Sequence, residues 1–128
     1  MNDLKFESIA TSIEQSNMLV KEFCMDIGTA DMFWRYSKVD QHNYLIAIDE
    51  YEQMYSANVP AWSLTRLIKL MPTLTEYGRL SMVRNGEEVT EFRYGTEIIF
   101  GSPDPVDAAV QMIEWLLVHN LIQKEDEI

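Results

Sequence analysis

Apolar and small residues recur at helical spacing near the start of the chain. They lie at Ile13, Ser16, Leu19, Val20, Phe23 and Cys24. Such a stripe is typical of a helix that buries one face. Thr11 with Glu14 three residues later predicts a capping box at its beginning, and Gly28 predicts a stop nearby. We expect this helix over about residues 11–25. Because Cys24 lies on the stripe, we expect its thiol to pack as a small apolar group.

Two strand-like segments follow this first helix. Residues 32–38 are rich in aromatic side chains, and residues 43–51 alternate between two sets of side chains as a strand requires. The polar residues 39–43 between them are turn-like. The pattern predicts a β-hairpin.

A second helix is predicted over residues 61–71. Leu64, Leu67, Ile68 and Met71 share one face at helical spacing. Pro60 suits the first turn of a helix, and Pro72 prevents its continuation. Trp62 and Arg66 are four residues apart on the opposite side, which would let the guanidinium lie over the indole ring.

A second hairpin surrounds Asn85 and Gly86. A three-residue loop over residues 84–86, with Gly86 in the left-handed region, pairs residues of like parity. This register places one set of large apolar side chains on one face, namely Leu80, Met82, Phe92, Tyr94, Ile98 and Phe100. We choose it because burial of a whole apolar face outweighs a local turn preference.

The third helix is predicted over residues 105–121. Asp104 is a good N-cap, Pro105 fits the first helical position, and Asp107 adds a carboxylate near the positive end of the helix. The core stripe of this helix consists of Val106, Ala109, Val110, Ile113, Leu116, Leu117 and Leu121. A second, narrower apolar surface lies roughly opposite and comprises Ala108, Met112, Trp115 and Ile122.

The predicted order is therefore helix, hairpin, helix, hairpin, helix. No strand–helix–strand unit with parallel pairing is required, so the sequence predicts an α+β fold with a small, mainly antiparallel sheet packed by helices. At 128 residues the chain matches the usual size of one domain, and we expect a single domain over residues 1–128.

The charge restricts the partners to consider. The chain has 21 acidic and 10 basic residues and a net charge of −11. Direct binding to nucleic acid or to an anionic membrane relies on Lys and Arg and is not expected. The sequence shows no signal peptide and no apolar run of membrane-spanning length. Together with a single cysteine, these features lead us to expect a soluble cytoplasmic protein.

No constellation of catalytic or metal-binding residues is evident. The two histidines, His42 and His119, have no further Cys or His at ligand spacing, so we expect no metal site. The five glycines are scattered and form no phosphate-binding loop. We therefore expect no cofactor and no enzymatic activity.

Aromatic side chains are the remaining candidates for function. Trp34, Tyr36 and others could line a groove, although core packing should claim most of them. The helical phase leaves four residues off the core stripes, which we take as candidate interaction residues: Trp62, Arg66, Met112 and Trp115.

The principal hypothesis is accordingly a non-enzymatic accessory or protein-binding module. Two alternatives remain: an acidic inhibitor that mimics nucleic acid, and a small-molecule enzyme with a pocket that the sequence does not reveal. The second apolar surface of the third helix also raises the hypothesis of a homodimer formed through Trp115. In the competing explanation, the N-terminal segment around Leu4 and Phe6 covers this surface.

Several short motifs resemble a group of small uncharacterised proteins of gut bacteria and their phages or mobile elements. The motifs are TSIEQS at Thr11–Ser16, TADMFW at Thr29–Trp34, PAWSL at Pro60–Leu64 with LMP at Leu70–Pro72, and PVDAA at Pro105–Ala109 with WLL at Trp115–Leu117. Asp104 stands where the group would have Asn. The resemblance covers most of the chain and implies only a small intracellular accessory protein.

Overall fold

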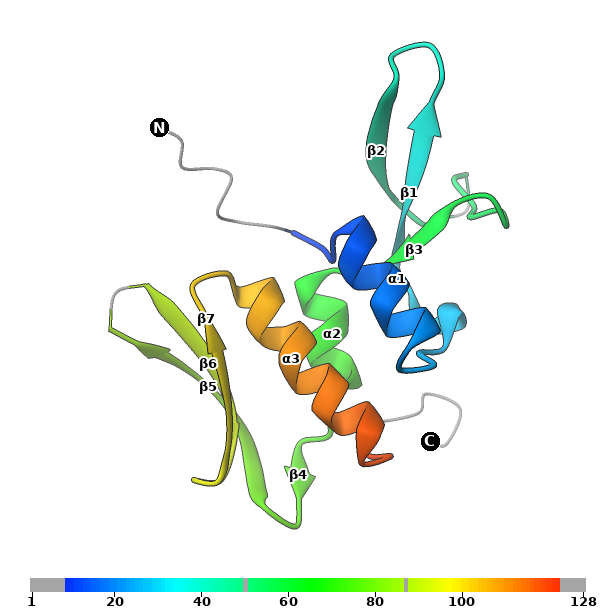
Figure 1. Cartoon of the computed structure of the whole chain (residues 1–128). Helices are drawn as coiled ribbons and strands as arrows, with labels where there is room; N and C mark the ends of the chain where they lie inside the picture. Colours follow the sequence, from blue (N-terminus) through cyan, green and yellow to red (C-terminus); the bar gives the residue numbers. More distant parts are fainter. Residues whose placement is uncertain (1–8, 50, 87, 123–128) are drawn as a thin grey trace.

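A computed structural model describes residues 9–49, 51–86 and 88–122 of the chain. Over these residues the fold is α+β, with three α-helices, one short 3-10 helix and two antiparallel sheets (Figure 1). The helical elements are α1 (Ile13–Lys21), η2 (Ile27–Thr29), α2 (Leu64–Leu70) and α3 (Pro105–Val118). The predicted α+β class is thus confirmed, but two small antiparallel sheets replace the one sheet that was predicted.

Each of the two sheets is built from strands that lie close together in the sequence. The first sheet has the order β2-β1-β3, with β1 at Met32–Ser37, β2 at His42–Ala47 and β3 at Val59–Ala61. The second has the order β4-β5-β6-β7, with β4 at Leu74–Thr75, β5 at Gly78–Asn85, β6 at Val89–Tyr94 and β7 at Ile98–Ser102. Both predicted hairpins are present. The predicted element order is incomplete, because β3, β4 and β7 extend the hairpins into sheets.

Helix α1 begins one residue later than predicted. The capping box is formed by Ser12 and Gln15, whose side chains accept from each other's backbone N–H groups. Thr11 instead lies buried, where its hydroxyl contacts that of Ser16 and accepts from the backbone N–H of Trp62. The long-range contact with Trp62 therefore uses the Thr11 side chain, which local spacing had assigned to the cap.

The end of α1 differs from the prediction in a second way. The helix ends at Lys21, well before Gly28. Cys24 follows in the left-handed region, with a φ of 58°, and its side chain is exposed. The expectation that Cys24 packs in the core is wrong, because the chain reverses direction here and turns the thiol outward.

The segment before α2 is a strand where a helical turn was predicted. Pro60 belongs to β3 and pairs with Phe33. The N-cap is Ser63, whose hydroxyl accepts from the backbone N–H of Arg66. Trp62 therefore precedes the helix, and its side chain is fully buried rather than exposed on a helical back face. Proline is compatible with both an edge strand and the first turn of a helix, so Pro60 alone could not distinguish between them.

The second hairpin has the predicted parity but a different loop. Leu80 pairs with Tyr94 and Met82 pairs with Phe92, so like parity faces like parity. The last pair is Asn85 with Val89, which leaves residues 86–88 between the strands instead of the predicted 84–86. Gly86 adopts the left-handed region, as expected, with a φ of 72°.

Helix α3 is the central element of the core. It contacts β6 and β7 on one side and α2 on the other (Figure 1). Asp104 caps its beginning and Pro105 occupies the first turn, as predicted. At its other end Asn120 is left-handed, and the N–H groups of Asn120 and Leu121 donate to the carbonyls of Leu117 and Leu116 in a Schellman motif.

The second apolar surface of α3 is covered by the chain itself. Ala108 and Met112 are fully buried, like the residues of the predicted core stripe. Trp115 is half-buried, with its ring edge-on to that of Tyr77 at 5.5 Å and stacked on that of His119 at 4.3 Å. The prediction that Met112 lies off the core is wrong, and the reason for expecting a dimer through this face no longer holds. Leu4 and Phe6 lie outside the described residues.

Candidate protein-docking surface

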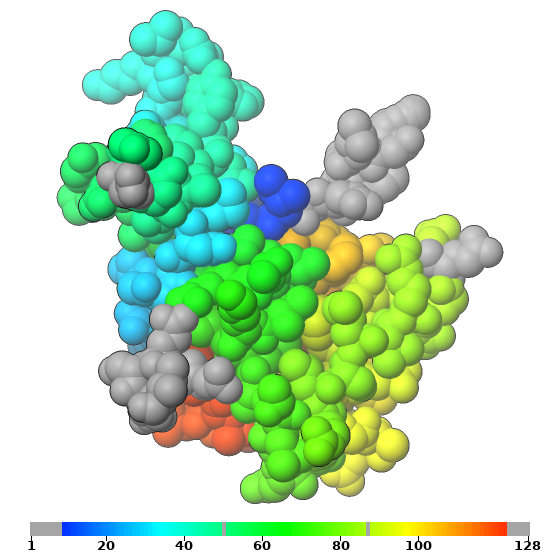
Figure 2. Space-filling model, turned by 180° about the vertical axis from the view of Figure 1, so that it is seen from behind, coloured from blue at the N-terminus to red at the C-terminus, as the bar shows by residue number. Residues whose placement is uncertain are grey.

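The hairpin of β1 and β2 projects from the rest of the molecule, and we call residues 32–47 the arm (Figure 1). Strand β3 pairs with β1 only at Met32–Trp34, so the outer half of the arm is a two-stranded ribbon. Figure 2 shows the outer part of the arm standing clear of the remaining body. A free-standing ribbon exposes both faces to solvent.

A buried ring and a half-buried hydrogen bond anchor the base of the arm. Phe33 is fully buried. On the other face, the indole N–H of Trp34 donates to the backbone carbonyl of Thr11 at 3.0 Å. Thr11 is itself joined to Trp62 through two further hydrogen bonds. The base of the arm is therefore fixed to the segment that leads into α1.

The exposed tyrosines of the chain gather on the arm and on the loop that follows it. These are Tyr36, Tyr44, Tyr51 and Tyr55, of which Tyr51 is 83% exposed. The other two, Tyr77 and Tyr94, pack in the body. The tip of the arm adds Val39, which is 92% exposed. Tyrosine is enriched where proteins meet, because its ring is apolar and its hydroxyl is polar.

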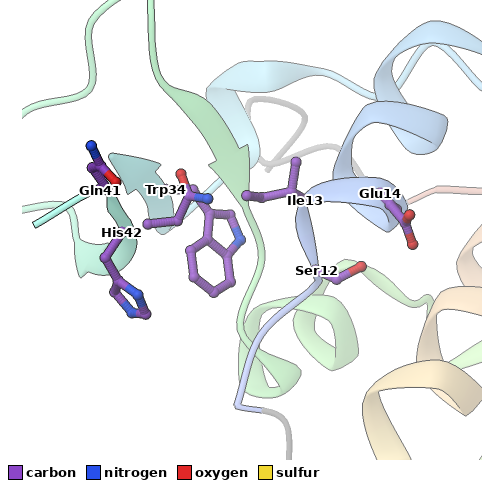
Figure 3. A pocket seen from close by; sticks show the side chains of 7 residues that line it. Ser12, Ile13, Glu14, Trp34, Gln41 and His42 are labelled. Carbon is purple, nitrogen blue, oxygen red and sulfur yellow. The ribbon is translucent and has the colours of Figure 1, made fainter. Parts of the chain in front are cut away.

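An open groove lies between the arm and the beginning of α1 (Figure 3). Its volume is about 520 Å³, and its lining comprises Ser12, Ile13, Glu14, Trp34, Gln41, His42 and Asn43. In the view of Figure 3 the Trp34 indole stands between His42 and Ile13. The groove thus combines an aromatic wall with polar side chains and one carboxylate.

Acidic groups surround the arm. Asp40 lies in its turn and accepts a hydrogen bond from the Tyr44 hydroxyl, which raises the pKa of that tyrosine. Asp49 follows β2, where its carboxylate accepts from the backbone N–H groups of Tyr51 and Glu52. Of the cations, Arg35 is paired with Glu52 at 3.3 Å and lies over the Phe33 ring.

The histidines take part in aromatic contacts. His42 meets the edge of the Tyr44 ring at 4.9 Å, and His119 stacks on Trp115. In the part of the chain that the structure describes, no group of three or more His, Cys, Asp or Glu is arranged to hold a metal ion. None of the helices in these ranges is both long and apolar enough to cross a membrane.

The structure does not bring the four candidate interaction residues onto one surface. The Trp62 indole N–H donates to the Thr29 hydroxyl at 2.9 Å, and the Arg66 Nε donates to the Thr29 carbonyl at 2.7 Å. Trp62 and Arg66 are therefore linked by their hydrogen bonds to Thr29, and not by a four-residue spacing along one helix. Met112 lies in the core, and Trp115 is half-buried among aromatic rings.

The sequence named Trp34 and Tyr36 of the arm as residues that could line a groove, but it did not place them among the candidate interaction residues. Helical phase directed attention to α2 and α3, which turn out to be covered. The available signal was the polar character of residues 39–43 between two aromatic segments, which indicates a hairpin. The pattern does not reveal that this hairpin leaves the body.

Comparison of the chain with protein-family models, with curated proteins and with solved structures finds no match. The candidate site therefore stands on its geometry.

Proposed function

We propose that the chain is a non-enzymatic, protein-binding module that contacts its partner through the arm and the adjoining groove. The observation that carries this proposal is the concentration of exposed tyrosines between residues 36 and 55. Tyrosine is enriched at protein interfaces, where its ring supplies a large apolar contact area and its hydroxyl a hydrogen bond. We place this activity in a reducing cytoplasm, with which a free, exposed Cys24 is compatible.

The contacts of the carboxylates favour this function over mimicry of nucleic acid. A mimic needs acidic groups that are free and arrayed like phosphates. Here several of the described carboxylates serve the fold: Asp26 caps η2, Asp31 binds Ser63, and Asp107 accepts from the Gln15 side chain. Asp104 caps α3, and Glu91 binds Arg93. These contacts support the ordinary role of acidic residues, which is to cap helices and to keep a protein soluble.

The proposal is tested by comparing two double variants in affinity capture from a lysate of the native host. The arm variant is Tyr36→Ala with Tyr44→Ala, and the control is Ile99→Ala with Val118→Ala, which also removes two exposed apolar side chains. We expect a protein captured by the wild type and by the control to be lost with the arm variant. The purified partner should then bind the wild type and the control with equal affinity in calorimetry.

Both variants change surface residues, so thermal unfolding should show each within about 0.5 kcal/mol of the wild type. Capture that is equal for the arm variant and the wild type would refute the proposal. Turnover of a small molecule by the purified protein would favour the enzyme alternative.

A further inference from the structure

The two sheets have four edge strands, and these differ in how well they are protected against pairing. Strand β4 has only two residues, β3 contains Pro60, and β7 contains Gly101. Short length, proline and glycine all weaken an edge as a template for another strand. Strand β2 has six residues and contains no Lys, Arg, Asp, Glu, Pro or Gly.

The position of β2 makes this edge accessible. Among the described residues β2 pairs only with β1, so its other side presents unpaired backbone groups. It lies on the projecting arm, and its first three residues are exposed. An added strand would find the groove with Trp34 on one face of the arm and the Tyr44 ring on the other. These surfaces could contact alternate side chains of the added strand.

We infer that β2 takes up an extended, basic segment of a partner protein as an additional strand of the first sheet. This inference rests on the proposed function and specifies how the partner is held. Backbone hydrogen bonds to β2 would supply affinity, and the two faces of the arm would select side chains at alternate positions.

The charge around the edge indicates a basic occupant. Asp40 lies beyond one end of β2, Asp49 lies beyond the other, and Glu14 lines the groove. Lys38 is the cation near the tip, while Arg35 is neutralised by Glu52. Lys or Arg near the ends of the added strand would therefore be attracted. A second copy of this chain is disfavoured by its net charge of −11.

A library of random seven-residue peptides displayed on phage tests the inference directly. The library is selected on the wild type alone, and the enriched peptides are then measured on Asn43→Lys, which places a positive charge on the exposed edge and repels basic peptides. We expect the enriched peptides to alternate apolar residues with Lys or Arg and to bind Asn43→Lys at least about tenfold more weakly. The control Ser81→Lys places the same charge on exposed β5 and should bind like the wild type.

Amide hydrogen exchange identifies the mode of binding. In the free protein, alternate amides of β2 point away from β1 and should exchange fast, and a bound peptide should slow them. Enriched acidic peptides, or binding that leaves these amides fast, would overturn the inference. A library without enriched peptides would also overturn the inference. So would slow exchange of the β2 amides that depends on protein concentration in the absence of peptide, because it would show that a second copy of this chain occupies the edge. If partner capture still depends on Tyr36 and Tyr44, the proposed function survives the failure of this inference.

Discussion

The backbone N–H of Trp62 donates to the hydroxyl of Thr11 at 3.1 Å across a separation of 51 residues. The same hydroxyl lies 2.7 Å from that of Ser16, and the Thr11 N–H donates to the Trp62 carbonyl. One buried threonine thereby joins the start of α1 to the segment that leads from β3 into α2. The base of the arm depends on it, because Trp34 binds the carbonyl of Thr11.

Replacement of Thr11 by Val should destabilise the protein by about 1 to 3 kcal/mol. The shape is conserved, but the Trp62 N–H and the Ser16 hydroxyl lose their partner in a buried place. Urea denaturation measures the change. Thr65→Val, at an exposed position of α2, is the matched control and should cost much less. Equal losses for the two variants would show that the buried hydroxyl contributes nothing.

Gly95 and Gly86 provide a matched pair of left-handed glycines, with φ of 63° and 72°. A Cβ at Gly86 meets nothing within 4 Å, whereas one at Gly95 would lie 2.0 Å from the Tyr77 carbonyl oxygen. Gly86→Ala should cost about 1 to 2 kcal/mol for the backbone conformation alone. Gly95→Ala should cost at least about 3 kcal/mol, because a backbone clash is added. Equal midpoints of the two variants in thermal unfolding would contradict the expected difference.

Trp115→Ala should destabilise the protein by about 2 to 4 kcal/mol, because the indole packs on the core and on the rings of Tyr77 and His119. We expect the sedimentation coefficient of the folded variant to equal that of the wild type, since this ring is covered from within the chain. Val118→Ala, exposed on the same helix, should change neither property. A shift from dimer to monomer would restore the hypothesis of a dimer through α3.

Glu114 should make stability depend on pH. Burial raises the pKa of its carboxyl above the ordinary value of 4.5, and the nearby Glu22 raises it further. The folded state therefore holds the proton more tightly than the unfolded state. The resulting stabilisation is complete below pH 4.5 and is lost as the pH rises through the raised pKa.

At neutral pH, Glu114→Gln should therefore be more stable than the wild type, by less than about 1 kcal/mol because solvent screens the group. The difference should disappear in acid. Denaturant titrations at several pH values measure it, with Glu97→Gln in the exposed turn before β7 as the control. A variant that is less stable than the wild type at neutral pH would refute the assignment.

Periodicity predicted the elements that depend on local pattern. Capping and the apolar stripe of α3 were readable because Asp104, Pro105 and the buried residues follow one another in sequence. The parity of the β5–β6 pairing followed from the aim of placing Leu80 and Met82 on the same face as Phe92 and Tyr94. These features require no knowledge of distant residues.

The remaining features depend on partners far away in the sequence. Local spacing placed the cap at Thr11, but the contact with Trp62 buries Thr11, and Ser12 caps the helix. Trp62 was placed on a helix because Pro60 fits a first turn, yet the pairing of Pro60 with Phe33 makes this segment a strand. The arm escaped prediction for the same reason: a pattern shows that two strands pair, but not that neighbouring elements leave them uncovered.

Helix α3 is both the last helix of the described chain and the element around which the others pack. A ribosome delivers the chain from its N-terminus, so β5, β6 and β7 exist before α3 does. Until α3 is made, the apolar side chains of Phe92 and Tyr94 lack the helix that covers them. Folding of the second sheet should therefore wait until α3 is made, and a polypeptide that still lacks α3 should be the form most exposed to proteases and chaperones.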